Sequence, residues 1–319
     1  MRVVIIGGTG HIGSYLTPRL IEAGHSVTCI SRGVREPYIR HSAWKHVTQL
    51  HLNRSAEESV GTFGERIAQL DPEAVIDLTC YSLESATQLA EALRDRGTDS
   101  GTYLLHCGTI WVHGSSVEVP TTEEQPRRPF GDYGVRKASI EAYLLAQAAS
   151  SKLTVTVLHP GHLVGPGWNP INPTGNFNPG VFSALAAGVE VILPNIGMET
   201  VHHVHADDVT QGFMKALTRR NMAECESFHL VSSAALTLRG YAEAMASWFG
   251  QPPRLRFLPY EEWRQTVSEK DAAVTWDHIA HSPNCSIQKA RERLGYAPRY
   301  SSLEAVKESV SWMQQNGVL

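Results

Sequence analysis

Short apolar runs alternate with helical patterns through the first half of the chain. Between the runs, apolar residues recur at the spacing of an amphipathic helix, as at Ile12, Leu16 and Leu20. Strands separated by helices form parallel βαβ units with right-handed crossovers. The pattern therefore predicts an α/β fold with a doubly wound parallel sheet. Its expected strands are residues 2–6, 26–30, 47–52, 74–78, 103–106 and 154–159.

The second half of the chain has a different texture. Residues 161–178 are rich in Gly, Pro and Asn and predict a long loop, which inside a compact domain is usually functional. Further helices are expected near residues 181–187, 206–217, 237–249, 287–294 and 302–315. We therefore expect one domain over residues 1–165, rejoined by residues 201–230, and a smaller domain interleaved with it over residues 166–319.

Glycines spaced by three residues follow the first strand and open the first helix. Gly7 permits a tight turn, Gly10 lets a pyrophosphate approach the backbone, and Gly13 lets the helix pack closely on the strand. The helix N-terminus then offers free N–H groups and a positive dipole end to the phosphates. The turn predicts that residues 1–165 form a dinucleotide-binding Rossmann domain. Its expected cofactor contacts are Gly7, Thr9, Gly10, His11, Ile12 and Gly13.

The end of the second strand bears on the choice of cofactor. An acidic residue at this place would accept a hydrogen bond from the ribose 2′-hydroxyl of NAD. The chain has Ser31 and Arg32 here, and its next carboxylate is Glu36. Because arginine suits the geometry of a phosphate, we expect both residues to bind the 2′-phosphate of NADP. The alternative is that Arg32 stacks on the adenine and that the site accepts NAD as well.

Tyr133 and Lys137 lie one turn apart on a predicted helix, so their side chains share a face. A free tyrosine has a pKa of about 10 and is a poor base at neutral pH. A cation one turn away favours the phenolate and lowers that pKa. The pair can therefore move a proton to or from a substrate oxygen while a hydride moves at the adjacent carbon.

Several motifs in a fixed order make the sequence resemble the extended short-chain dehydrogenases/reductases, which include NAD-dependent sugar epimerases and dehydratases. The resemblance covers nearly the whole chain, and the order of the motifs is much more specific than any single motif. The motifs are GGTGHIG at 7–13, HCGTIWVHG at 106–114, TEEQPRRPFGDYGVRK at 122–137, HPGHLVGPG at 159–167, HVHADDV at 203–209 and SIQKARERLGYAP at 286–298.

The resemblance implies a catalytic trio. Tyr133 is the acid/base, and Lys137 lowers its pKa and holds the nicotinamide ribose. Thr109 stands five residues before Gly114 and matches the Ser or Thr of the family. Its hydroxyl is expected to bond the reacting substrate oxygen and fix its geometry.

Further positions are expected around the two ligands. Thr79, Pro160 and His162 are predicted to contact the cofactor. Trp111 and His113 either flank the substrate pocket or pack beneath it. Asn176 belongs to the Asn-rich loop, where amide side chains can bind sugar hydroxyls or simply form turns.

These residues favour an NAD(P)-dependent oxidoreductase or epimerase that acts on a hydroxyl/ketone pair of a sugar nucleotide or related polyol. Related 4,6-dehydratases carry Asp-Glu directly after the catalytic Thr, whereas this chain has Ile110 and Trp111, so dehydration is not expected. An NADPH-dependent reductase of a small ketone is the nearest alternative, and uronate decarboxylation is a weaker one. A non-catalytic nucleotide sensor or RNA-associated protein is the remaining alternative.

Composition narrows the partners. The net charge of −4 argues against a nucleic-acid partner, and no run of about 18 apolar residues predicts a membrane span. The five cysteines form no CxxC pair, which fits a reducing cytoplasm. His202, His203 and His205 lack a clear carboxylate or thiolate partner, so no metal site is expected. The resemblance implies a homodimer formed through helices such as the one that carries Tyr133.

Overall fold

The computed structural model describes residues 1–94, 101–150 and 153–319. Its central element is a seven-stranded parallel sheet with the strand order β11-β6-β5-β4-β1-β2-β3. The direction of strand addition reverses between β1 and β4, which is where a doubly wound sheet opens a ligand crevice. The strands are β1 (Arg2–Ile6), β2 (Ser26–Ser31), β3 (Thr48–His51), β4 (Ala74–Asp77), β5 (Tyr103–Cys107), β6 (Thr154–Pro160) and β11 (Glu226–Leu230). The expected doubly wound Rossmann sheet is confirmed.

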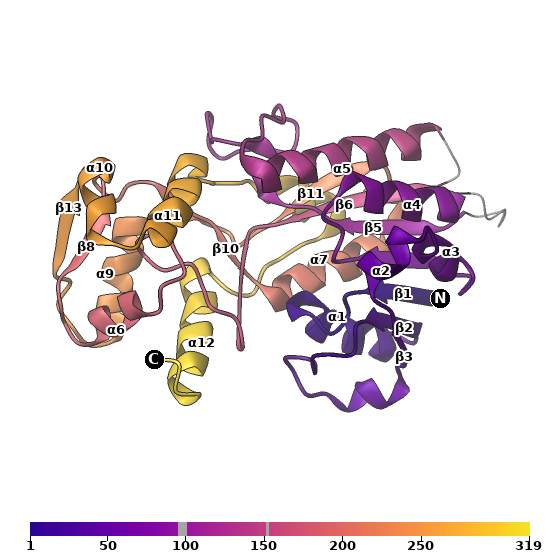
Figure 1. Ribbon diagram of the computed structural model, residues 1–319, viewed down its shortest axis with the longest axis horizontal. Helices are drawn as coiled ribbons and strands as arrows, with labels where there is room; N and C mark the ends of the chain where they lie inside the picture. Colours follow the sequence, from indigo (N-terminus) through magenta and orange to yellow (C-terminus); the bar gives the residue numbers. More distant parts are fainter. Residues whose placement is uncertain (95–100, 151–152) are drawn as a thin grey trace.

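Helices cover both faces of this sheet (Figure 1). Successive side chains of a strand point to opposite faces, so Val3 and Ile5 of β1 enter one core while Val4 and Ile6 enter the other. The first core is closed by α1 (His11–Glu22) and α7 (Ala206–Thr218). The second is closed by α3 (Phe63–Ala68), α4 (Leu83–Arg94) and α5 (Gly131–Ser150). The strand β1 is therefore apolar on both faces, as expected for a parallel sheet covered on both sides.

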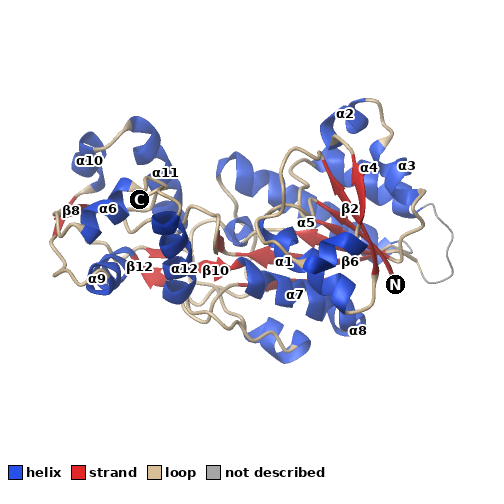
Figure 2. Cartoon of the chain, turned by 90° about the horizontal axis from the view of Figure 1, so that it is seen from below, coloured by secondary structure: helices blue, strands red, loops and turns tan. Residues whose placement is uncertain are grey.

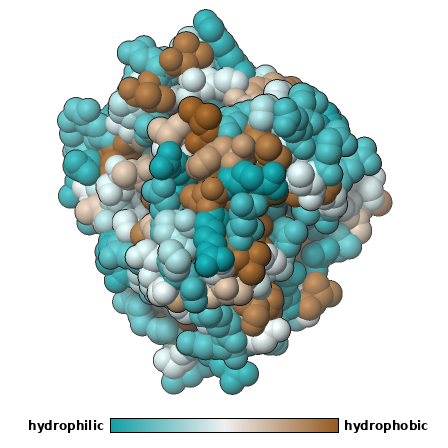
Figure 3. Space-filling view, turned by 90° about the vertical axis from the view of Figure 1, so that its left-hand side faces the viewer, coloured by the Kyte–Doolittle hydropathy of each residue, from teal (hydrophilic) through white to brown (hydrophobic). Residues whose placement is uncertain are grey.

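The remainder of the chain forms a smaller lobe beside the sheet, with its own apolar core (Figures 1 and 2). Phe182, Leu193, Met245 and Val306 belong to that core. The helices of the lobe are α6 (Gly180–Ala186), α9 (Leu238–Trp248), α10 (Tyr260–Trp263), α11 (Glu269–His281) and α12 (Ser302–Gln315). The outer end of this lobe interleaves polar and apolar side chains (Figure 3).

The remaining strands form three small two-stranded sheets. They pair β7 (His162–Val164) with β10 (His203–His205), β9 (Thr200–Val201) with β12 (Leu236–Thr237), and β8 (Val191–Pro194) with β13 (Leu255–Leu258). Short helical turns lie at η1 (Ser42–His46), α2 (Arg54–Ser59), η2 (Ile110–His113), α8 (Arg220–Ala223), η3 (Arg264–Thr266) and η4 (Ala290–Leu294). In the described residues, no helix combines the length and apolar content needed to cross a bilayer.

The structure departs from the expected elements mainly in the second half. The stretch 161–178 is not a loop throughout, because His162–Val164 forms β7 against β10. The helix α11 was not predicted, although Ser268 caps it and Ala272, Thr275 and Ile279 give it a buried stripe. The return of the chain to the large sheet occurs at β11, which pairs with β6 in parallel.

Candidate active site

A cavity of about 550 Å³ lies along the carboxyl ends of β1, β2 and β4, at the reversal of strand order. This is the place where doubly wound sheets bind their ligands. Six residues predicted to contact the cofactor line it: Gly7, Thr9, Gly10, Ser31, Arg32 and Thr79. Three further residues that follow β3 also line the cavity and were not predicted from the sequence: Leu52, Asn53 and Arg54.

The glycine turn has the close contacts that a dinucleotide turn needs. Gly7 has φ +86°, and a Cβ there would lie 2.5 Å from Cγ2 of Thr79. A Cβ on Gly13 would lie 2.4 Å from the carbonyl oxygen of Gly8, so α1 packs directly on the turn. At Gly10 the nearest atom would be the Gly7 carbonyl at 3.1 Å, so this position is open toward the cavity. The turn therefore fits a pyrophosphate, with the free N–H groups of the first turn of α1 beside it.

His11 and Ile12 do not line the cavity with their side chains. The His11 ring is 4% exposed and stacks on Trp168 at a centroid distance of 4.9 Å, and Ile12 belongs to the core under the sheet. Burial lowers the pKa of His11 to about 3, with a further contribution from His205. The side chains of both residues are therefore structural, which corrects the expectation that they face the cofactor. Only their backbone remains available to it.

The cavity wall is cationic where the second strand ends. Arg32 and Arg35 both line it, and its lining residues within the described ranges include no Asp or Glu. Arg35 donates a hydrogen bond to the hydroxyl of Tyr38 at 2.6 Å. Arg54 is occupied differently, because its guanidinium bonds both carboxylate oxygens of Asp77 at 2.8 and 2.9 Å. Arg32 and Arg35 are thus the cations of this wall that face a ligand.

Lys137 is buried where β4 and β5 end. Its Nζ donates to the carbonyl of Cys80 at 2.7 Å and to that of Cys107 at 2.8 Å. The same ammonium lies 4.9 Å from the ring centroid of Tyr81. Because Lys137 and Tyr133 are one turn apart on α5, the helix places both side chains toward these strand ends.

Tyr133 meets Thr109 at the same edge. The Thr109 hydroxyl lies close enough to the phenol to lower its pKa, and it accepts a hydrogen bond from the backbone N–H of Trp111 at 3.3 Å. The Tyr133 side chain is 44% exposed, yet desolvation by the surrounding protein raises its pKa above the usual 10, and Thr109 only partly opposes this. The Lys137 ammonium is directed at two carbonyls, and its effect on the Tyr133 pKa stays a prediction.

Aromatic and histidine rings pack together beside Tyr133. Trp111 packs edge-on to Tyr133 at 5.9 Å, and its indole N–H donates to Nε2 of His162 at 3.2 Å. His281 stacks on Trp111 at 4.0 Å, and His278 meets it at 5.3 Å. Sequence reasoning missed both of these histidines because it missed α11, whose Ser268 cap was the available signal.

Two predicted substrate residues have other partners. His113 is 6% exposed and bonds His229, so it packs beneath the cleft rather than flanking it. The Asn176 amide donates to the hydroxyls of Thr174 and Thr275, both at 3.0 Å, and accepts from Asn172 at 2.7 Å. Its N–H groups are used by Thr174 of the loop and Thr275 of α11, so the amide has no N–H left for a substrate contact. Pro160 ends β6 and is buried against Leu230 of β11.

Comparison with known proteins identifies the family. The profile of the NAD dependent epimerase/dehydratase family matches residues 3–230. The chain belongs to this family. The match spans the glycine turn, Thr109, Tyr133 and Lys137, and it confirms the resemblance seen in the sequence and the assignment as an enzyme.

Relatives of this epimerase/dehydratase family member align over most of its length. The chloroplast stem-loop binding protein of 41 kDa b of Arabidopsis thaliana is 23% identical over 97% of this chain and 78% of its own. A UDP-glucose 4-epimerase of Mycolicibacterium smegmatis is 24% identical over 98% of this chain and 99% of its own. The structure of a UDP-glucose 4-epimerase of Thermus thermophilus, in complex with NAD, has a TM-score of 0.72 at 21% identity and covers 98% of this chain and 99% of its own. At these identities the structural likeness establishes the fold.

Proposed function

We propose that this protein is an NAD(P)-dependent oxidoreductase or epimerase that acts on a hydroxyl/ketone pair of a sugar nucleotide or related polyol. The observation that carries the proposal is the meeting of Thr109, Tyr133 and Lys137 at the ends of β4 and β5, beside the glycine-turn cavity. These residues can hold a substrate oxygen and exchange a proton with it. The named relatives that are UDP-glucose 4-epimerases agree with this class of substrate.

Each member of the trio has a separate task in the proposed mechanism. Tyr133 carries its proton at neutral pH, because burial raises its pKa, and donates it to a ketone oxygen. Thr109 bonds the same oxygen and fixes its orientation. Lys137 holds the carbonyls of Cys80 and Cys107, which fixes the strand ends on which the other two depend. When bound, a nicotinamide supplies or accepts the hydride.

The test is the substitution Tyr133→Phe, assayed on a panel of sugar nucleotides and small ketones. Loss of the proton donor is expected to lower kcat by roughly 10²- to 10⁴-fold, with dinucleotide affinity little changed. Tyr143→Phe on the same helix, where the ring packs against the core, is the matched control and should keep full activity. Full turnover by Tyr133→Phe would overturn the mechanism.

The same cavity supports NADP as the preferred cofactor, since Arg32 and Arg35 face it and no carboxylate does within the described lining. That preference favours a simple NADPH-dependent ketone reductase as the second candidate, and a protonated Tyr133 suits ketone reduction. The two candidates differ in what the purified protein holds. Retained NAD, released on denaturation, supports the epimerase, which recycles its hydride internally. An exchangeable site that binds NADPH supports the reductase.

A non-catalytic RNA-associated role is a third candidate, because one relative is a chloroplast stem-loop binding protein. The net charge of −4 and the assembled trio count against it. Salt-sensitive RNA binding without any turnover of cofactor would favour it.

Homodimer formation and a cytoplasmic location are further proposals. Light scattering of the purified protein tests whether it forms a homodimer.

A further inference from the structure

Three buried histidines meet beneath the segment that carries Thr109. His159 of β6 and His229 of β11 are direct partners in the parallel ladder, so their side chains leave the same face of the sheet. His113 ends η2 and lies against both of them. One ring nitrogen from each residue lies within 4.8 Å of those of the other two. A set of residues distant in sequence thus converges at one point.

The ring nitrogens already show where a ligand lone pair is directed. Nδ1 of His229 lies 3.2 Å from the carbonyl oxygen of Ser286, to which it donates, so Nε2 is the unprotonated nitrogen. Nε2 of His113 lies 2.8 Å from that nitrogen and must donate to it. In this hydrogen-bond pattern each of the two rings carries one proton, which is the neutral form that binds metal ions.

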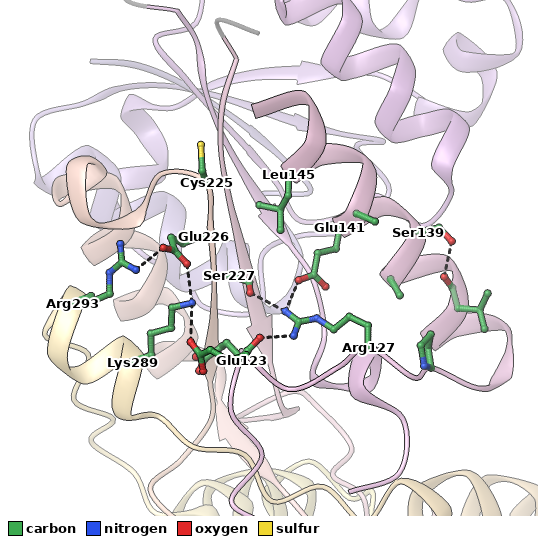
Figure 4. A pocket seen from close by; sticks show the side chains of 15 residues that line it. Glu123, Arg127, Ser139, Glu141, Leu145, Cys225, Glu226, Ser227, Lys289 and Arg293 are labelled. Carbon is green, nitrogen blue, oxygen red and sulfur yellow. Dashed lines mark hydrogen bonds and ion pairs between the residues drawn. The ribbon is translucent and has the colours of Figure 1, made fainter. Parts of the chain in front are cut away.

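A carboxylate from α5 lies beside His159, although it is not one of the three residues whose ligand atoms converge. Oε2 of Glu141 lies 3.2 Å from Nε2 of His159. Oε1 of Glu141 accepts from Nη2 of Arg127 at 2.7 Å, and the same Nη2 donates to the hydroxyl of Ser227 at 2.9 Å. Figure 4 shows Arg127 and Glu141 directed at one another inside a pocket of about 850 Å³ that opens at this point. The pocket gives an ion a path to the carboxylate.

The cluster leaves polar atoms without partners. In the described part of the chain, both nitrogens of His159 and Oε2 of Glu141 lack a hydrogen bond of acceptable geometry, as does Nδ1 of His113. The His159 and Glu141 side chains are 0% and 4% exposed. Nε2 of His159 and Oε2 of Glu141 still face one another at 3.2 Å, whereas Nδ1 of His159 and Nδ1 of His113 have no partner, which is unfavourable for buried polar atoms.

The histidines at 202, 203 and 205 differ from this cluster because each bonds a separate partner. His202 bonds the carbonyl of Ser232 through Nε2, His203 bonds that of Ile171, and His205 bonds the carboxylate of Glu308. Their side chains are directed at separate partners and do not converge.

We propose that His113, His159 and His229 form a buried site for Zn²⁺ and that the carboxylate of Glu141, 3.2 Å from His159, moves in as the fourth ligand of a tetrahedral ion. Three imidazoles and one carboxylate are a donor set of the type that zinc binds. The Ser286 carbonyl already supplies the outer-shell acceptor that a zinc-bound histidine uses to fix its tautomer. Zinc binding replaces the hydrogen bond between His113 and His229, and the displaced proton of His113 moves to its unpartnered Nδ1. With Zn–N bonds of about 2.0–2.1 Å, the two nitrogens separate to about 3.3 Å.

The site is structural rather than catalytic, because all four positions come from the protein and no position is left for substrate. Its ligands tie together four elements: η2, α5, β6 and β11. Thr109 is the N-cap of η2, and Lys137 precedes Glu141 by one turn of α5. A bound ion would therefore hold fixed the two segments on which the candidate trio is mounted. This proposal departs from the sequence-based expectation that the chain binds no metal, and it does not depend on the proposed reaction.

Metal content and metal binding of the full chain test the proposal. Protein purified without chelator or metal-affinity resin is expected to contain roughly one zinc ion per chain by mass spectrometry of the elements. Chelator-treated protein should regain it on titration with Zn²⁺, with a rise in Tm. Titration with Co²⁺ should produce the intense visible bands of a tetrahedral ion. Absence of zinc from the isolated protein, together with no Tm shift and no tetrahedral Co²⁺ spectrum, would overturn the proposal.

Substitutions locate the ion. His159→Gln and His229→Gln should each reduce zinc content at least about tenfold and abolish the Co²⁺ spectrum. His202→Gln is the matched control, because His202 is equally buried but bonds Ser232, and it should keep the metal even if Tm falls. Zinc retained at full content in a folded His159→Gln variant would show that the ion lies elsewhere. If either variant fails to fold, the Co²⁺ spectrum of the unmodified chain still decides the coordination geometry.

Discussion

At the scale of single residues, the cofactor cavity is distinguished by the side chains that follow β2. Ser31, Arg32 and Arg35 line it where a carboxylate would otherwise bind the ribose of NAD. Arg54 lines the same cavity but is neutralised by Asp77, with which it forms two hydrogen bonds. The charge presented to a ligand therefore comes from Arg32 and Arg35, and Arg35 is held by Tyr38.

Arg32→Ala is expected to separate the two cofactors. Loss of a charge-assisted bond to the 2′-phosphate removes about 1.5–3 kcal/mol, or roughly 10- to 100-fold in the Kd for NADPH. NADH, which lacks that phosphate, should lose much less. Titration of both dinucleotides into both proteins measures this. Equal losses for NADH and NADPH would instead indicate that Arg32 stacks on the adenine.

The short turn η2 also explains why Trp111 and His113 have different surroundings. Trp111 and His113 stand two positions apart, and the sequence leaves open whether each flanks the substrate pocket or packs beneath it. The η2 turn directs them differently: Trp111 faces Tyr133, whereas His113 turns into the protein toward His229. Spacing alone did not distinguish these directions, because the turn that sets them is only four residues long.

At the scale of elements, the contact between the glycine turn and α1 fixes the cofactor edge. Gly13 is packed against the backbone of Gly8, whereas Gly10 has open space toward the cavity. The two glycines therefore serve different purposes, one in the packing of the helix and one in the approach of a ligand.

Alanine at these two positions should separate stability from binding. Gly13→Ala drives a Cβ into the Gly8 carbonyl and is expected to cost about 1–3 kcal/mol of unfolding free energy, which exceeds the helix propensity gained from alanine. Gly10→Ala should change stability by less than about 1 kcal/mol yet weaken dinucleotide binding strongly, because its Cβ occupies the space of the pyrophosphate. Urea denaturation and dinucleotide titration measure the two effects. Unchanged binding by Gly10→Ala would contradict this placement of the phosphates.

At the scale of the whole molecule, the sheet cannot be completed by the first half of the chain. One face of β1 packs against α1 and α7, and the same core takes Phe228 from β11 and Leu294 from η4. Residues 1–165 contain neither α7 nor β11. The domain boundary that we propose near residue 165 is therefore a boundary of function and not of independent folding.

A fragment of residues 1–165 is accordingly expected not to fold alone, because it exposes the apolar face that α7 and β11 cover. The fragment should show no cooperative urea transition by circular dichroism. Co-expression with residues 166–319 should restore a soluble complex, and the full chain is the control. A cooperative transition in the isolated fragment would show that the face is not needed for stability.

Much of the fold and part of the site follow from local sequence. Six of the seven strands of the sheet follow from short apolar runs between helical patterns, whereas β11 was not predicted. The glycine turn and the Tyr133–Lys137 pair follow from their spacing. The helix α11 was missed because its buried stripe is narrow and its sequence is mostly polar. His278 and His281 lie on this helix, so their contacts with Trp111 were missed as well.

The sequence by itself determined the sheet, the dinucleotide turn and the family, because these depend on periodicity and on spacings within a few residues. Only the tertiary structure decided which groups meet across the chain. It directed Lys137 at two carbonyls instead of the phenol, and it raised the Tyr133 pKa by burial. It also brought His113, His159 and His229 together through strand register and one short turn. Register and burial depend on contacts between distant segments, and no local pattern records them.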